Sequence, residues 1–174
     1  MIGNNSISLL TDAWMKGIRT ICPEKALEAM IHQTEARHPG ISSVGRDGFG
    51  YYDRLGYVPY PEVHEATAKT LEYAYADWCV ARFADSIGRK EIADTYYRKA
   101  LNYRNLYYPD YGFMWAKDAN GKWRDAFDAT EWGGPFTEGS SWHWTWSVLH
   151  DPEGLSRLMG GHTAMEARLD SMFT

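Results

Sequence analysis

The stretch from Val63 to Ile87 reads VHEATAKTLEYAYADWCVARFADSI and contains neither glycine nor proline. Gly88 follows it directly, and glycine readily adopts the left-handed conformation at which helices end. The stretch therefore predicts the longest helix of the chain. Its apolar residues cover more than one face, so we expect this helix to be buried on most sides. They are Leu71, Ala74, Tyr75 and Trp78 in one stripe, widened by Val80, Ala84 and Ile87.

Glu72 and Asp77 are two carboxylates in the middle of this predicted helix. A carboxylate on a mostly buried helix needs a partner, because an unpaired buried charge is costly. The simplest expectation is structural pairing with Lys69, with Arg82 or with a backbone N–H group of a loop. A role in a functional site is the alternative, and the sequence leaves both open.

Two amphipathic segments precede this helix. Ser6 to Ile18 has apolar residues at helical spacing, and Pro23 suits the first position of a second helix that we expect to reach Arg37. The short connection between them predicts a helical hairpin. The expected inward residues are Ile7, Leu10, Trp14 and Ile18 on the first helix, and Ala26, Leu27, Met30 and Ile31 on the second.

Further helices are predicted after Gly88. One spans Arg89 to Tyr107, and a last one spans His162 to Phe173 after the Gly160-Gly161 pair. About six or seven helices are expected in all. The expected inward residues of the first are Ile92, Ala93, Tyr96, Tyr97, Ala100, Leu101, Tyr103 and Leu106. The last is amphipathic, with Met165, Leu169 and Met172 along one side.

Two long segments between the helices have a different composition. His38 to Pro61 holds five glycines, four tyrosines and three prolines, and Tyr108 to Pro135 is rich in turn formers. We expect neither to be regular helix, and loops of this length in a compact fold are commonly functional. Six of the eight tryptophans lie between positions 115 and 146, which favours a binding site over uniform core packing.

The composition bounds the function. With 174 residues, 44% of them hydrophobic, the chain has the length of one domain and can bury a core. Its net charge is −5 and it has no basic cluster, so we expect no nucleic-acid partner. Cys22 and Cys79 are expected to be buried free thiols rather than a disulfide. No apolar run is long enough to span a bilayer and no signal-peptide pattern opens the chain, so no membrane partner is expected.

The stretch from Phe136 to Asp151 places a carboxylate, Glu138, between a Gly-Gly-Pro turn and three alternating tryptophans. Tryptophan faces suit the C–H faces of a sugar, and desolvation among such rings would favour the protonated carboxyl. A protonated carboxyl is what the acid of a glycosidase needs. A core-facing helix start, with Glu138 in its first turn, is the competing interpretation. Because the tryptophans alternate, at least one of them should lie in the core.

The same stretch resembles the α-mannosidases of glycoside hydrolase family 92. Their usual pattern is Thr-Glu-Gly-Asn-x-Trp-Gln-Tyr, then Pro-His-Asp, Gly-Leu and Gly-Gly. Four further stretches of this chain match the family upstream, so the resemblance covers nearly the whole chain. The matching segments are Thr137 to Trp146, Val148 to Asp151, Gly154-Leu155 and Leu158 to Gly161, and upstream Met1 to Asn4, Asp12 to Arg19, Gly56 to Pro59 and Lys69 to Trp78.

The resemblance implies an all-α fold: a helical-hairpin array with long aromatic-rich loops, forming about half of an (α/α)6 barrel. Residues 1–174 would then be a partial catalytic domain without a second domain. The unpaired flanks of such a half barrel are expected to self-associate. A periplasmic or secreted location of the full-length protein is also implied, although this chain shows no signal.

The resemblance also implies an exo-acting, inverting α-mannosidase, most simply one for α-1,2 linkages, whose partner is a mannose-containing glycan. Glu138 matches the general acid, and we expect Ser140, Trp142, His143 and Trp144 to contact substrate, with Trp142 beside the acid. Ser140 and His143 depart from the usual Asn and Gln, so the polar contacts around the acid are altered. The family's base lies in a Gly-Asn-Asp type motif that residues 1–174 lack. A calcium ion is implied too, but its ligands cannot be assigned here.

Three classes of function stay open at this point. The chain is a fragment of a hydrolase, a non-catalytic carbohydrate-binding helical module, or a helical scaffold. Residues 93–109 resemble a tetratricopeptide helix, but a repeat protein needs further copies and none is found. A Gly-Asn-Asp motif downstream in the parent gene would favour the hydrolase.

Overall fold

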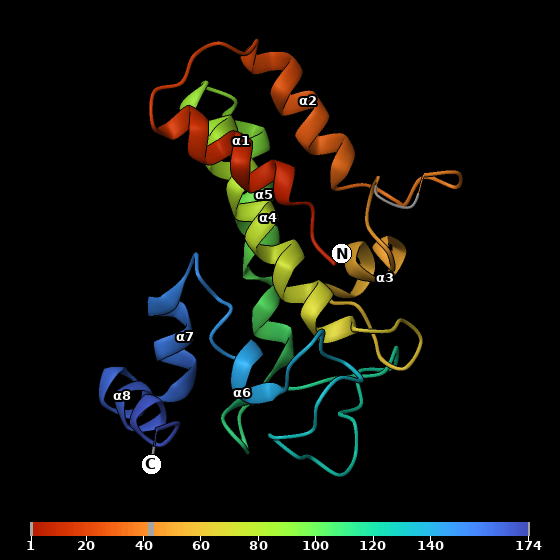
Figure 1. Ribbon diagram of the computed structural model, residues 1–174, viewed down its shortest axis with the longest axis vertical. Helices are drawn as coiled ribbons and strands as arrows, with labels where there is room; N and C mark the ends of the chain where they lie inside the picture. The colour runs from red at the N-terminus through yellow and green to blue at the C-terminus, as the bar shows by residue number, and fades with distance from the viewer. Residues whose placement is uncertain (1, 42–43, 174) are drawn as a thin grey trace.

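Helix α4 (Ala66–Ser86) runs through the middle of the molecule (Figure 1). The computed structural model describes residues 2–41 and 44–173, so Met1 of the first matched motif lies outside the described residues. As predicted, α4 is buried on most sides and ends before Gly88, whose φ is +79°. It begins at Ala66 rather than at Val63, because Glu65 has a left-handed backbone that interrupts the helix there.

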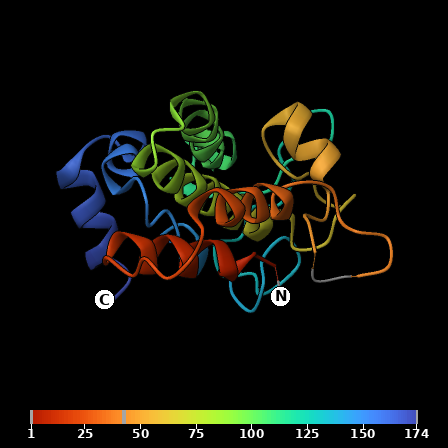
Figure 2. The same ribbon diagram turned by 90° about the horizontal axis from the view of Figure 1, so that it is seen from above.

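Three helices pack around one half of α4. They are α1 (Asn5–Met15), α2 (Pro23–Gln33) and α5 (Lys90–Lys99). Figure 2 shows α1 and α5 on two sides of α4. This confirms the predicted hairpin array. The buried core between them contains Ile7, Leu27, Met30, Val80, Phe83, Ala84 and Ala93.

Both N-terminal helices are shorter than predicted. Gly17 has a φ of +89° and ends α1 before Ile18, so the expectation that Ile18 points inward is wrong and its side chain is exposed. Helix α2 ends at Gln33, because the Thr34 hydroxyl donates to the Ile31 carbonyl oxygen at 2.7 Å and the chain turns away.

The segment from His38 to Pro61 is not entirely irregular, which corrects the prediction. It contains helix α3 (Phe49–Leu55), and both flanking glycines, Gly48 and Gly56, have a φ of +73°. Glycine tolerates this left-handed backbone, so the two residues that seemed to forbid a helix instead delimit a short one.

The helix after Gly88 changes its period. Helix α5 is followed by a 3-10 helix, η1 (Ala100–Leu106), in which side chains three positions apart share a face. Ala100, Tyr103 and Leu106 are therefore buried, whereas Leu101 is 40% exposed. The predicted inward position of Leu101 is wrong because the α-helical spacing does not continue through this segment.

The second long loop begins with a small hairpin, β1 (Tyr107–Tyr108) and β2 (Phe113–Met114). Trp115 is fully buried after β2, while Trp132 is 65% exposed. The concentration of tryptophans in this region therefore serves the core as well as the surface.

Three short helices complete the chain: α6 (Ser141–Trp144), α7 (Pro152–Met159) and α8 (His162–Asp170). Helix α8 has no buried residue, so its predicted apolar side is only half covered, by contacts of Met165 with the cluster around Leu155. Cys79 is a buried free thiol as predicted, but Cys22 is exposed. Among the described residues, no helix has the length and apolar character needed to cross a membrane.

Candidate active site

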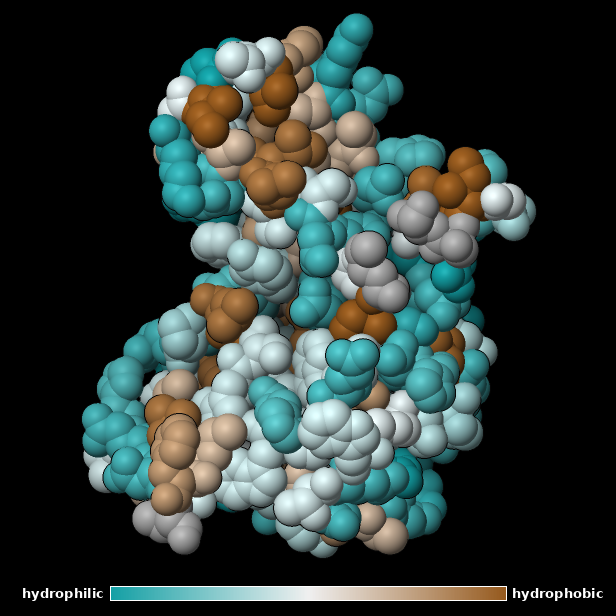
Figure 3. Space-filling model, viewed as in Figure 1, coloured by the Kyte–Doolittle hydropathy of each residue, from teal (hydrophilic) through white to brown (hydrophobic). Residues whose placement is uncertain are grey.

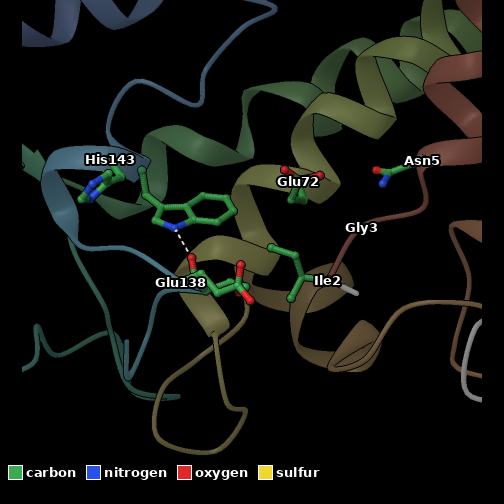
Figure 4. Close-up of a pocket in the computed structure, with 8 residues that line it drawn as sticks. Ile2, Gly3, Asn5, Glu72, Glu138 and His143 are labelled. Carbon is green, nitrogen blue, oxygen red and sulfur yellow. Dashed lines mark hydrogen bonds between the residues drawn. The ribbon is translucent and has the colours of Figure 1, made fainter. Parts of the chain in front are cut away.

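A pocket of about 540 Å³ lies between the N-terminal segment, α4 and the loop that leads into α6 (Figure 4). Small-molecule sites commonly have volumes of about 300–1,000 Å³, so this pocket has the size of a small-molecule site. Two carboxylates, Glu72 and Glu138, reach it from different elements. The pocket is lined by Ile2, Gly3, Asn5, Glu72, Thr137, Glu138, His143 and Trp144.

The loop that carries Glu138 is held by backbone hydrogen bonds. The Thr67 N–H group, at the start of α4, donates to the Pro135 carbonyl oxygen at 3.0 Å, and the Gly133 N–H group donates to the Gly139 carbonyl oxygen at 2.8 Å. Glu138 itself has a φ of +45°, which is uncommon for a residue other than glycine. Backbone strain of this kind is concentrated at functional sites, where the surrounding structure enforces it.

Trp144 forms one wall of the pocket. Its indole Nε1–H donates to the Thr137 carbonyl oxygen at 2.9 Å, which fixes the ring beside the residue that precedes Glu138 (Figure 4). His143 also lines the pocket, and its ring meets Trp132 edge-on with ring centroids 5.5 Å apart. The tryptophan-rich stretch and the predicted acid thus meet at one cavity.

Helix α6 is anchored to the hairpin behind the pocket. The Ser141 hydroxyl donates to the Met114 carbonyl oxygen at 2.9 Å, and the Met114 N–H group donates to Thr145 Oγ1 at 2.9 Å. Both side chains are fully buried. These bonds satisfy both backbone groups of Met114 and set the position of the helix that carries Trp144.

Comparison with known proteins agrees with this arrangement. The profile of the glycosyl hydrolase family 92 catalytic domain matches residues 1–174. The chain belongs to this family.

Solved structures of the family resemble this chain closely. An inverting GH92 mannosidase from Bacteroides thetaiotaomicron VPI-5482 is 81% identical with a TM-score of 0.96, over 99% of this chain and 23% of that one. A GH92 α-mannosidase from Bacteroides thetaiotaomicron in complex with mannoimidazole is 30% identical with a TM-score of 0.87, over 99% of this chain and 23% of that one. The GH92 catalytic domain is an (α/α)6 barrel, which confirms the predicted fold class.

A curated relative is an uncharacterized secreted glycosidase of Arthroderma benhamiae. It is 27% identical over 200 residues, and the match covers 97% of this chain and 26% of the relative. The chain therefore spans about a quarter of the length of the relatives it matches.

The two departures from the GH92 pattern interact with each other. The Ser140 N–H group donates to Nδ1 of His143 at 3.2 Å, so the pair closes the first turn of α6. Ser140 is buried and does not line the pocket, whereas His143 is exposed at its wall. Of these two departures, both predicted to contact substrate, the structure therefore brings only His143 to the cavity.

Trp142 does not lie beside Glu138, which corrects the prediction. Residues two positions apart point to roughly opposite sides of a helix, so Trp144 takes the place at the pocket and Trp142 faces the other way. There Trp142 packs edge-on against Phe113, with ring centroids 4.7 Å apart. The sequence alone could not tell which tryptophan would face the acid.

The predicted desolvation of Glu138 by tryptophan rings is also wrong for this chain. The Glu138 side chain is exposed, because the indole of Trp144 bonds to the backbone of Thr137 instead of covering the carboxylate. Further burial of Glu138 would need cover from residues outside this chain or from a ligand.

Glu72 is a further residue at the pocket, for which the sequence left both structural pairing and a functional role open. It is half-buried on α4, and burial raises the pKa of its carboxyl above the ordinary value. Gly3 and Asn5 also line the pocket. Gly3 lies in the matched segment Met1 to Asn4 and Asn5 lies next to it, but the match did not indicate that either residue lines a pocket.

The calcium ion that the resemblance implies would need oxygen ligands, commonly including carboxylates. Across residues 2–41 and 44–173, no group of three or more His, Cys, Asp or Glu side chains could hold a metal ion. These four kinds of side chain therefore do not form a metal-binding cluster by themselves in this part of the protein.

Proposed function

We propose that this chain is the part of an exo-acting, inverting GH92 α-mannosidase that carries the general acid, Glu138. The observation that carries the proposal is the position of Glu138 at the wall of a pocket of about 540 Å³, on a strained loop beside Trp144. The 81% identity to a structure described as an inverting mannosidase supports the same conclusion. The substrate would be a mannose-containing glycan, with α-1,2 linkages as the first to test.

An inverting glycosidase needs two carboxyl groups roughly 6.5–9.5 Å apart, one to protonate the leaving oxygen and one to activate water. In this proposal Glu138 supplies the proton, and His143 and Trp144 contact the sugar or the leaving group. The catalytic base comes from another part of the domain, because residues 1–174 contain no Gly-Asn-Asp sequence.

The test is Glu138→Gln in the complete catalytic domain. Activity on unactivated α-mannosides should fall about 10²- to 10⁴-fold, because the leaving oxygen is no longer protonated. Substrates with activated leaving groups, such as dinitrophenyl α-mannoside, should lose much less. Glu166→Gln, at an exposed position on α8, is the matched control and should leave both rates unchanged. Equal loss on both kinds of substrate would contradict the assignment of Glu138 as the acid.

We propose further that the 174-residue chain alone is inactive and self-associates. Figure 3 shows apolar side chains gathered over the end of the molecule formed by α1 and α2, and Leu9 and Ile18 there are 69% and 53% exposed. Light scattering should detect a dimer or a larger assembly. A monodisperse monomer that hydrolyses α-mannosides would contradict both parts.

The use of calcium and the location of the full-length protein are both implied by the family resemblance. We propose that the complete enzyme uses calcium, which removal by a chelator and readdition would test. We also propose a periplasmic or secreted location, in line with the relative described as secreted.

A further inference from the structure

Glu72 differs from every other acidic side chain on the buried part of α4. Asp77 is paired with Arg46 at 2.8 Å and accepts a hydrogen bond from the Tyr52 hydroxyl at 2.8 Å. Lys69, the expected partner on the same helix, is bound to Asp47 at 2.8 Å. Glu72 has neither a hydrogen bond nor an ion pair within the part of the chain that the structure describes. Its carboxylate is therefore half-buried without a compensating donor.

The position of Glu72 explains why it has no protein donor. The side chain extends from α4 into the same pocket that Glu138 enters from the opposite element (Figure 4). The surrounding wall is formed by Ile2, Gly3 and Trp144, and the Trp144 indole N–H is already used by the Thr137 carbonyl oxygen. The Glu72 carboxylate is thus an acceptor that faces the cavity.

The backbone of Gly3 lies directly against this carboxylate. The backbone at Gly3 passes so close to Glu72 that an added Cβ would lie 2.5 Å from Glu72 Oε2, well inside van der Waals contact. Any side chain at position 3 would displace the carboxylate. The absence of a side chain at Gly3 therefore leaves room for the carboxylate in the position that it occupies in this structure.

We infer that Glu72 is a substrate-binding residue whose carboxylate accepts hydrogen bonds from hydroxyl groups of the sugar in this pocket. The inference rests on the proposed function, since it takes the ligand of the pocket to be a sugar. A carboxylate is an acceptor and sugar hydroxyls are donors, so the ligand supplies the bonds that the protein does not. The alternative is a structural carboxylate that is paired by a residue elsewhere in the complete domain.

The test compares Glu72→Gln with wild type in the complete catalytic domain, using calorimetric titration with mannoimidazole. Hydrogen bonds to charged groups predict a loss of affinity of about 10- to 100-fold. The Tm without ligand should stay the same or rise, because the amide carries no buried charge. Glu166→Gln serves as the control for a lost surface charge. A lowered Tm with unchanged affinity would overturn the inference in favour of the structural alternative.

A double-mutant cycle with Gly3→Ala adds an independent test. Gly3→Ala alone should weaken binding by displacing the carboxylate, but it should have no further effect in a Glu72→Ala background, because the affected group is gone. Additive losses would overturn the link between the two residues.

Failure of the inference is distinguishable from failure of the proposed function. If wild type binds mannoimidazole but cleaves no α-mannoside, the hydrolase assignment fails. The difference in mannoimidazole affinity between wild type and Glu72→Gln then still tests the Glu72 inference. If wild type cleaves α-mannosides and Glu72→Gln binds equally well, only the Glu72 inference fails. A wild type that binds neither mannoimidazole nor mannose overturns both.

Discussion

The buried ion pair between Arg46 and Asp77 should be the most sensitive point of the fold. Arg46 is 2% exposed and Asp77 is fully buried, with Arg46 Nη2 and Asp77 Oδ1 2.8 Å apart. Burial opposes the charged form of Arg46, but the adjacent Asp77 carboxylate, together with Tyr52 and Tyr73, raises the Arg46 pKa above its ordinary value. The two side chains therefore form a buried ion pair.

Arg46→Met keeps much of the side-chain volume but leaves the Asp77 carboxylate with the Tyr52 hydroxyl as its main partner. Removing one partner of a buried pair costs about 3–5 kcal/mol, since the remaining charge is uncompensated. Urea unfolding followed by tryptophan fluorescence would measure this loss in free energy of unfolding. Adding Asp77→Asn should recover part of the loss, because the orphaned charge is then removed.

A surface pair provides the control for this experiment. Arg157 and Glu153 form an ion pair between exposed side chains on α7, and Arg157→Met should cost at most about 0.5 kcal/mol. If Arg46→Met costs no more than Arg157→Met, or if the double variant costs the sum of the two single ones, the reasoning from burial is refuted.

Two further changes test the surroundings of the site. The hydrogen-bonded ion pair with Lys69 lowers the pKa of Asp47 below its ordinary value of 3.8. The stability that this pair contributes is therefore present above pH 3.8 and is lost as the pH falls further. Lys69→Met should flatten the fall in free energy of unfolding at acid pH, and an unchanged fall would contradict this. Thr145→Val leaves the buried N–H of Met114 without its acceptor and should lower the free energy of unfolding by about 1–3 kcal/mol in urea titrations, whereas Thr163→Val at an exposed position should be nearly neutral.

Much of the fold follows from local sequence. The absence of glycine and proline from Val63 to Ile87 and the Gly88 stop predicted α4, because both act through the backbone of neighbouring residues. The predictions failed where the same residue type or spacing has a different structural effect in a different backbone conformation. Gly48 and Gly56 delimit a helix instead of forbidding one, and Leu101 is exposed because η1 has a period of three.

The site divides in the same way. The sequence by itself determined that Glu138 stands beside tryptophans and that Glu72 and Asp77 need partners on a buried helix. Only the tertiary structure decided that Asp77 is paired by Arg46 while Glu72 faces the pocket. Ion-pair partners that are distant in the sequence depend on how the loops pack against α4, and a local sequence pattern does not contain that information. For the same reason, the alternating spacing of the tryptophans did not show which of them lies at the cavity. The orientation of α6 in the folded chain places Trp144 there rather than Trp142.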